Sequence, residues 1–189
     1  MVRTMASFVN FIEWITRFFG YVAAWMILPL TLSMVWEVFS RYVLSAPTFW
    51  AYEIAYMLMG ASLMLGIAYT LQLRRHIRVD FVYDMVTPKQ RALIDVIGYI
   101  FFLLPVVLWM LWGLWDYLAY AYETNEVSGE SAWNPVVWPF RITLVFGFFL
   151  FMLQIIVEII KGGYVIMGQE PPGWSEAEDH GSSGHVVEQ

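Results

Sequence analysis

Three ionisable side chains lie close together in the stretch EVFSRYVLSAPTFWAYE, which joins two long apolar segments. On a helix, Glu37 and Arg41 lie one turn apart with the acid on the N-terminal side, which is the favourable order for an ion pair. Pro47 suits the first turn of a following helix. Glu53 then lies within about two turns of that helix start, where the helix dipole favours an anion. Such residues can either carry protons or lock a turn.

The cost of charge near lipid helps to choose between these two kinds of chemistry. An ionised side chain near the centre of a membrane-spanning helix costs roughly 2.5–3.5 kcal/mol, and charges inside spans usually face a helix bundle. Arg41 would hold Glu37 ionised and so oppose proton exchange. The sequence favours an ion pair in which Arg41 reaches Glu37 or Glu53, either as a lock on the first hairpin or as a docking surface for a partner. A titrating transport carboxylate is the third interpretation.

The composition of the 189-residue chain indicates a membrane protein. Hydrophobic residues make up 60% of it and charged residues 14%, against about half and about a quarter in soluble domains. Cysteine is absent, which excludes a disulfide framework, a thiolate metal site and a cysteine nucleophile. The chain has no basic arm, so nucleic-acid binding has little support. No nucleotide loop, zinc motif or serine triad pattern is visible, and we expect neither an enzyme nor a bound metal or cofactor.

Four apolar segments are long enough to cross a bilayer, which takes about 20 residues. We therefore predict an all-α integral membrane protein, with a four-helix membrane domain over residues 19–168. Its spans are expected at about residues 19–44, 50–73, 92–117 and 137–160.

The two ends of the chain differ from this domain. Residues 1–18 place phenylalanines on one helical face and Glu13 and Arg17 on another, which is typical of an amphipathic helix lying in the membrane interface. An extension of the first span is the alternative. Residues 169–189 are acidic and rich in Pro, Gly and Ser, and they lack the apolar side chains needed for order. We predict a disordered tail there.

Basic residues indicate the orientation, because short cytoplasmic loops are enriched in Lys and Arg. The segment between the second and third spans is basic, whereas the segment between the third and fourth is acidic. We therefore predict both termini on the cytoplasmic side of a bacterial inner membrane. The basic residues are Arg74, Arg75, Arg78, Lys89 and Arg91, and the acidic ones are Glu123, Glu126 and Glu130.

Other residues predict contacts between helices. Ser62, Gly66 and Thr70 form a ridge of small side chains on the second span, which permits close helix approach within the chain or to a partner. Pro105 in the third span removes one helix hydrogen bond and predicts a kink or an open carbonyl. Asp116 and Arg141 lie near the outer ends of the third and fourth spans and are candidates for an ion pair.

The block HIRVD follows the second span. His76, Arg78 and Asp80 are expected to set a cytoplasmic turn at the lipid headgroups, with contact to a partner subunit or to anionic lipid as the alternative. His76 is the only histidine outside the tail. A membrane haem held by two histidines inside the spans therefore has no ligands.

Taken in order, these blocks resemble the small permease subunit (DctQ-like) of tripartite ATP-independent periplasmic (TRAP) transporters. In that family E-V-x-x-R-Y-V ends the first span, P-x-x-W-x-x-E opens the second, and H-I-R-V-D closes the first hairpin. The outer segment 131–135 (SAWNP) and the tail are not part of this pattern. The matching residues are Glu37, Arg41, Tyr42, Pro47, Trp50 and Glu53, followed by His76, Ile77, Arg78, Val79 and Asp80.

The resemblance implies a non-catalytic subunit of a sodium-coupled importer of organic acids. In such transporters a large multi-span permease carries the substrate and sodium sites, and a periplasmic binding protein delivers the organic anion. The small subunit enlarges the fixed scaffold against which the transport domain moves. Two alternatives stay open: a four-span exporter that antiports protons through Glu37 as a homodimer, and a factor needed only for assembly of a partner.

Overall fold

The structure is a computed structural model that describes residues 2–73, 87–169 and 171. The HIRVD block (His76, Ile77, Arg78, Val79 and Asp80) and the predicted tail lie outside these residues. Within the described part, four helices are long and apolar enough to cross a membrane, and they occupy Met5–Tyr42, Ala51–Gln72, Lys89–Thr124 and Trp138–Ile166. The predicted all-α, four-span membrane fold is therefore confirmed.

The four spans are built from six helical elements. The first two are α1 (Val2–Tyr42) and α2 (Ala51–Gln72). The third span is one long helix composed of α4 (Pro88–Gly98), a π-helical turn η1 (Tyr99–Leu103) and α5 (Leu104–Thr124), and α6 (Trp138–Ile166) follows. The capping box of α4 explains its start, because Thr87 accepts from the backbone N–H of Gln90 and the Gln90 side chain accepts from the backbone N–H of Thr87.

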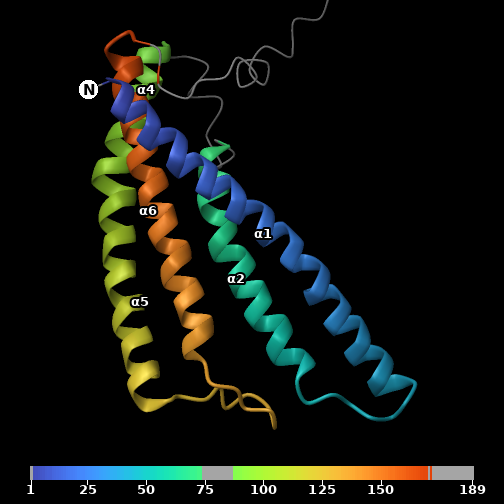
Figure 1. Ribbon diagram of the computed structural model, residues 1–189. Coiled ribbons are helices and arrows are strands. Elements are labelled where there is room, and N and C mark those ends of the chain that lie inside the picture. The colour runs from blue at the N-terminus through green and yellow to red at the C-terminus, as the bar shows by residue number, and fades with distance from the viewer. Residues whose placement is uncertain (1, 74–86, 170, 172–189) are drawn as a thin grey trace, which may run out of the picture.

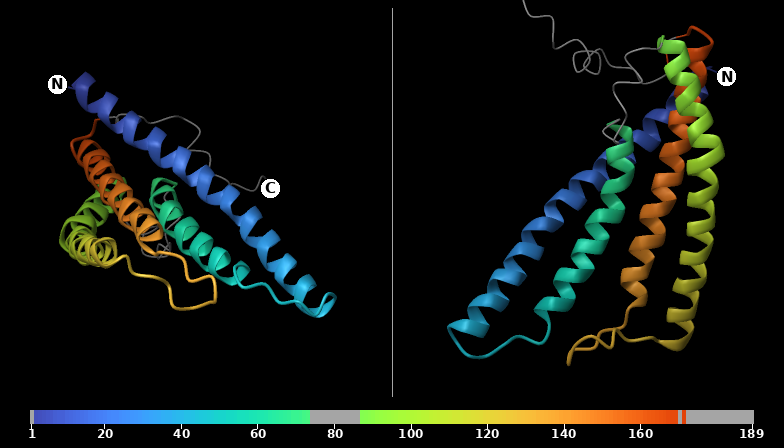
Figure 2. Two further views of the ribbon diagram at one scale, coloured as in Figure 1. Left: turned by 60° about the horizontal axis from the view of Figure 1, so that its bottom comes forward. Right: turned by 180° about the vertical axis from the view of Figure 1, so that it is seen from behind.

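The helices stand side by side in the order α1, α2, α6, α5, and α1 is inclined to α5 and α6 (Figures 1 and 2). The connections 43–50 and 125–137 lie at the same end of the molecule, which we call the turn end. The N-terminus, the start of α4 and the end of α6 lie at the opposite end, which we call the terminal end. Both hairpin connections therefore lie at the same end of the bundle, although about 80 residues separate them in sequence.

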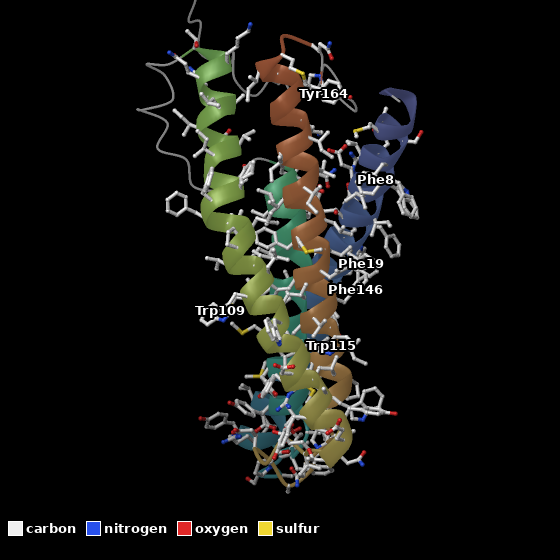
Figure 3. The ribbon with its side chains drawn as sticks, turned by 90° about the vertical axis from the view of Figure 1, so that its left-hand side faces the viewer. Phe8, Phe19, Trp109, Trp115, Phe146 and Tyr164 are labelled. Atoms are coloured by element: carbon white, nitrogen blue, oxygen red, sulfur yellow. The ribbon has the colours of Figure 1, made fainter. Side chains whose placement is uncertain are left out.

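The core lies where α6 packs between α2 and α5. It is a cluster of buried side chains with aromatic neighbours, among them Phe19 and Phe146, whose ring centroids are 4.8 Å apart (Figure 3). The outer faces are apolar as well, and Trp109 on α5 is 74% exposed. A helix that is apolar all round is typical of a membrane span, because lipid covers the outer face. The core cluster comprises Ala68, Leu71, Val107, Leu150, Phe151 and Ile155.

Residues 2–18 do not form a separate helix, because α1 continues unbroken through Tyr42. This continuity matches the alternative of an extended first span, and a location in the membrane interface stays a prediction. The faces also differ from the expected ones. Glu13 and Ile12 are buried, whereas Phe8 and Phe11 are exposed. The reason is that Glu13 forms an ion pair with Lys161 of α6, which turns this face of α1 toward α6.

The π-helical turn η1 lies directly before Pro105. The backbone N–H of Leu104 donates to the carbonyl of Tyr99, five residues earlier. A single π turn adds one residue to a helical turn and changes the register just where proline removes the next donor. The irregularity predicted at Pro105 thus takes the form of a widened turn.

Gly147 allows α6 to approach α2 closely. A side-chain carbon added there would lie 2.7 Å from the backbone oxygen of Met64, whereas one added at Gly113 on α5 would meet nothing within 4 Å. We expect Gly147→Leu to lower the free energy of unfolding by about 1–3 kcal/mol, because overpacking forces the helices apart. Gly113→Leu should be neutral or stabilising, since leucine favours helix more than glycine does. Denaturant titration in detergent, followed by tryptophan fluorescence, measures both changes; equal unfolding curves would contradict the packing role.

Candidate assembly site at the turn end

Glu37 joins the end of α1 to the connection that follows it. Its Oε1 atom accepts hydrogen bonds from Nε of Arg41 at 2.9 Å and from Nη2 of the same side chain. Its Oε2 atom accepts from the backbone N–H of Thr48 at 2.8 Å and from the Thr48 hydroxyl. The i, i+4 spacing brings Arg41 to Glu37, and the left-handed conformation of Ser45 (φ 52°) reverses the chain so that Thr48 returns. Arg41 therefore contacts Glu37 and not Glu53.

The Glu37 contacts are those of an ionised carboxylate that holds a turn. Every contact to its two oxygens comes from an N–H or O–H donor, and an ionised carboxylate is a pure acceptor. Glu37 is 6% exposed, whereas the Arg41 side chain is 56% exposed. The guanidinium therefore pairs with the buried acid and also presents an outer surface.

Glu53 lies in the first turn of α2 and holds the connection between α5 and α6. Its side chain is fully buried, and its Oε1 atom accepts hydrogen bonds from the hydroxyls of Ser128 and Ser131, each at 2.5 Å. Its Oε2 atom has no hydrogen-bond partner among the described residues. Glu53 thus ties the first hairpin to the second, and Ser131 belongs to the SAWNP segment, for which the sequence indicated no role.

The connection 125–137 has its own fold, which presents these serines. Val127 and Val136 form an isolated antiparallel bridge, and the backbone N–H of Gly129 donates to Oδ1 of Asn134 at 2.7 Å. Asn134 has a left-handed conformation with φ 49°, which asparagine tolerates better than most residues. The segment is an ordered loop that closes over the first turn of α2.

We expect Glu53→Gln to loosen this loop. The amide keeps the shape of the side chain but has one acceptor oxygen in place of two, and an ordinary hydrogen bond contributes about 0.5–1.5 kcal/mol. Hydrogen exchange at the amides of residues 126–136 should become faster than in the unaltered chain. Glu123→Gln is the matched control, because Glu123 is an exposed acid near the end of α5. Unchanged exchange in Glu53→Gln would contradict the anchoring role.

Arg141 closes the second hairpin with Glu126. Its Nη1 and Nη2 atoms donate to the two Glu126 oxygens at 2.8 Å each, and Nη1 also donates to the carbonyl of Tyr117 at 2.9 Å. The guanidinium lies 3.3 Å from the centroid of the Tyr117 ring. The sequence suggested Asp116 as the partner, but Asp116 lies on an exposed part of α5, whereas Glu126 folds back over the start of α6.

The other motif residues at the turn end lie at its surface. Tyr42 is 79% exposed, Pro47 is exposed and Trp50, the residue before α2, is half-buried. The exposure of Tyr42, Pro47 and Trp50 does not show whether they contact a partner subunit, so their role in assembly remains a prediction.

The small-residue ridge on α2 lies partly between helices. A side-chain carbon at Gly66 would lie 3.8 Å from Cβ of Ala23 on α1. The Ser62 and Thr70 hydroxyls donate to carbonyls of α2 itself, at 2.9 Å to Met59 and 3.0 Å to Gly66. Thr70 is exposed, so it leaves room for contact with a second protein.

A buried polar cluster at the terminal end was missed by sequence reasoning. Glu13 of α1 pairs with Lys161 of α6, and both are buried. The Thr16 hydroxyl donates to Oε1 of Gln154 at 3.3 Å, and Nε2 of Gln154 donates to Glu158 at 3.4 Å. The sequence signal for this cluster was the pair Glu158 and Lys161, three residues apart near the end of the fourth apolar segment. Charges in spans usually face the helix bundle.

The described residues provide no metal site, because no group of three or more His, Asp or Glu side chains converges there. Their ionic groups instead join helices and connections to one another, at both ends of the bundle. Fold and geometry therefore define a small multi-pass membrane protein whose buried charges brace the structure.

The family is shown by comparison with known sequences. The model of the DctQ component of tripartite ATP-independent periplasmic transporters matches residues 30–162. The chain belongs to this family, which is a family of transporter subunits and not one of enzymes. The match runs from the last third of α1 to the last part of α6 and includes the contacts of Glu37, Glu53 and Arg141. No curated protein and no solved structure matches the chain.

Proposed function

We propose that this chain is the small, non-catalytic permease subunit of a sodium-coupled TRAP importer of organic acids, and that it braces the large permease as part of the fixed scaffold. The observation that carries the proposal is the set of buried contacts at the turn end, where Glu37 holds the first hairpin, Arg141 holds the second and Glu53 ties the two together. A scaffold must not deform while a partner moves against it, and buried ionic ties oppose such deformation because breaking one strands a charge.

The partners follow from the family. A large multi-span permease carries the substrate and sodium sites, so this chain needs no cofactor, and a periplasmic binding protein supplies the organic anion. The basic residues between α2 and α4 and the acidic loop between α5 and α6 support an inner-membrane orientation in which the turn end is periplasmic. His76, Arg78 and Asp80 then lie on the cytoplasmic side.

A proton-coupled exporter is the alternative function. It requires Glu37 to exchange protons during transport, but both oxygens of Glu37 are already occupied by donors from Arg41 and Thr48. Proton-coupled efflux by the purified chain in liposomes, abolished by Glu37→Gln, would establish the exporter and overturn the proposal.

Extraction in mild detergent tests the proposal directly. The tagged chain should be recovered with a large multi-span permease in a 1:1 ratio. Liposomes that contain both subunits should take up an organic acid only when a sodium gradient and the binding protein are supplied. Recovery of the chain by itself from its native membrane would contradict the proposal.

Arg41→Ala should lower the yield of this complex. The change removes two hydrogen bonds from Glu37 and also removes the exposed guanidinium, so the carboxylate loses its cation and the outer surface loses a positive charge. Lys89→Ala, an exposed cation at the terminal end, is the control and should leave the yield unchanged. The amount of large subunit recovered per tagged chain measures the effect; equal yields would show that Arg41 has no part in assembly.

A further inference from the structure

A cavity of about 280 Å³ opens at the turn end, between α2, α5, α6 and the 125–137 loop. Tyr52, Tyr56, Tyr117 and Phe140 contribute aromatic rings to its wall, and Glu126, Glu130 and Arg141 contribute charges. No role described above uses this space. Its volume is enough for a small organic group and too small for a folded segment of protein.

The aromatic wall is continuous. The Tyr52 and Tyr56 rings are stacked with centroids 6.4 Å apart, and Tyr56 meets Phe140 edge to face at 5.4 Å. On the other side, the Arg141 guanidinium already lies over the Tyr117 ring. Aromatic faces attract cations because their π-electrons are partly negative, and aromatic cages are the usual site for ammonium groups.

The charges around the cavity favour a cation as well. Both Nη atoms of Arg141 donate hydrogen bonds to the Glu126 carboxylate. The positive charge of Arg141 is therefore already balanced, and it would attract an anion only weakly. Glu130 lines the cavity, and its carboxylate has no ion pair with any described residue. Ser128, another lining residue, is turned away from the cavity by its hydrogen bond to the fully buried Glu53.

We propose that this cavity binds an organic ammonium group, carried either by the ethanolamine headgroup of a phospholipid or by a small soluble amine. The rings of Tyr52, Tyr56 and Phe140 would contact the ammonium group, and Glu130 would neutralise its charge. The cavity lies beside the ends of three membrane spans, at the level where headgroups meet water in the orientation proposed above. The site belongs to this chain alone, so it can be tested without the transporter partners.

The test uses the full chain, purified in detergent and examined by native mass spectrometry. Short-chain phosphatidylethanolamine and phosphatidylglycerol are the lipid probes, and choline and ethanolamine are the soluble ones. Phosphatidylethanolamine should be retained in preference to phosphatidylglycerol, or a free amine should bind. Retention of the lipid without binding of free amines identifies a lipid headgroup, and the reverse identifies a soluble amine. The proposal fails if the two lipids are retained equally and no amine binds. This outcome counts against it whether or not a partner protein covers the cavity in the assembled transporter.

Matched variants locate the binding. Glu130→Gln and Tyr56→Leu should each weaken binding of the ammonium probe about tenfold, since they remove a charge and a ring. Tyr56→Phe keeps the ring and should bind nearly as well as the unaltered chain, which separates loss of the site from loss of the fold. Glu123→Gln and Tyr42→Leu, an exposed acid and an exposed tyrosine outside the cavity, should have no effect. Equal binding by all five variants would overturn the assignment.

Discussion

Lys161→Met should be among the most destabilising single changes in this protein, lowering its free energy of unfolding by about 3–5 kcal/mol. Lys161 is 3% exposed and pairs with Glu13, which is 8% exposed. Methionine fills a similar volume, but it leaves the Glu13 carboxylate buried without its cation. Because this pair joins α1 to α6, the first part of α1 should detach before the rest of the bundle unfolds.

The measurements separate charge from packing. Denaturant titration in detergent gives the unfolding free energy, and hydrogen exchange at residues 5–17 reports detachment of α1. Adding Glu13→Gln to Lys161→Met should restore much of the stability, since it removes the stranded charge. Lys89→Met, at an exposed position, is the control. If Lys161→Met is no worse than Lys89→Met, or if the double variant is the less stable one, the ion pair does not hold α1.

Arg141→Met should open the second hairpin and lower the free energy of unfolding by about 2–3 kcal/mol. The change removes three hydrogen bonds, two to Glu126 and one to the carbonyl of Tyr117. We expect a smaller effect than at Lys161, because the Glu126 side chain is 35% exposed and can reach water. Ser128 and Ser131 follow Glu126 in the loop, so their hold on Glu53 should weaken too.

Three further variants test this account of Arg141. Arg141→Lys keeps the charge but loses the planar, two-pronged contact with Glu126, and its stability should be intermediate. Glu126→Gln combined with Arg141→Met should cost less than the sum of the single changes, because the two residues act as one pair. Arg17→Met, at an exposed position on α1, is the control. Strict additivity in the double variant would contradict a direct pair. In limited proteolysis, the 125–137 loop should be cleaved faster in the less stable variants than in the more stable ones.

The sequence by itself determined the elements and the local contacts of this protein. The bilayer requires long apolar helices, so hydropathy alone located four spans. Glu37 and Arg41 are four residues apart on one helix, and Pro47 prevents that helix from continuing far beyond them. The first turn and its ion pair therefore depend only on neighbours in sequence, and the motif blocks there also indicated the family.

The tertiary structure decided the partners of charges that are distant in sequence. Glu53 binds Ser128 and Ser131, more than 70 residues away, Glu13 meets Lys161, and Arg141 selects Glu126 over Asp116. Sequence spacing could not predict these pairs, because helical periodicity fixes which residues share a face but not which face meets which neighbour. In a membrane the outer faces are as apolar as the inner ones, so the hydrophobic pattern did not indicate the inward side, and only the packing of α1, α2, α5 and α6 did.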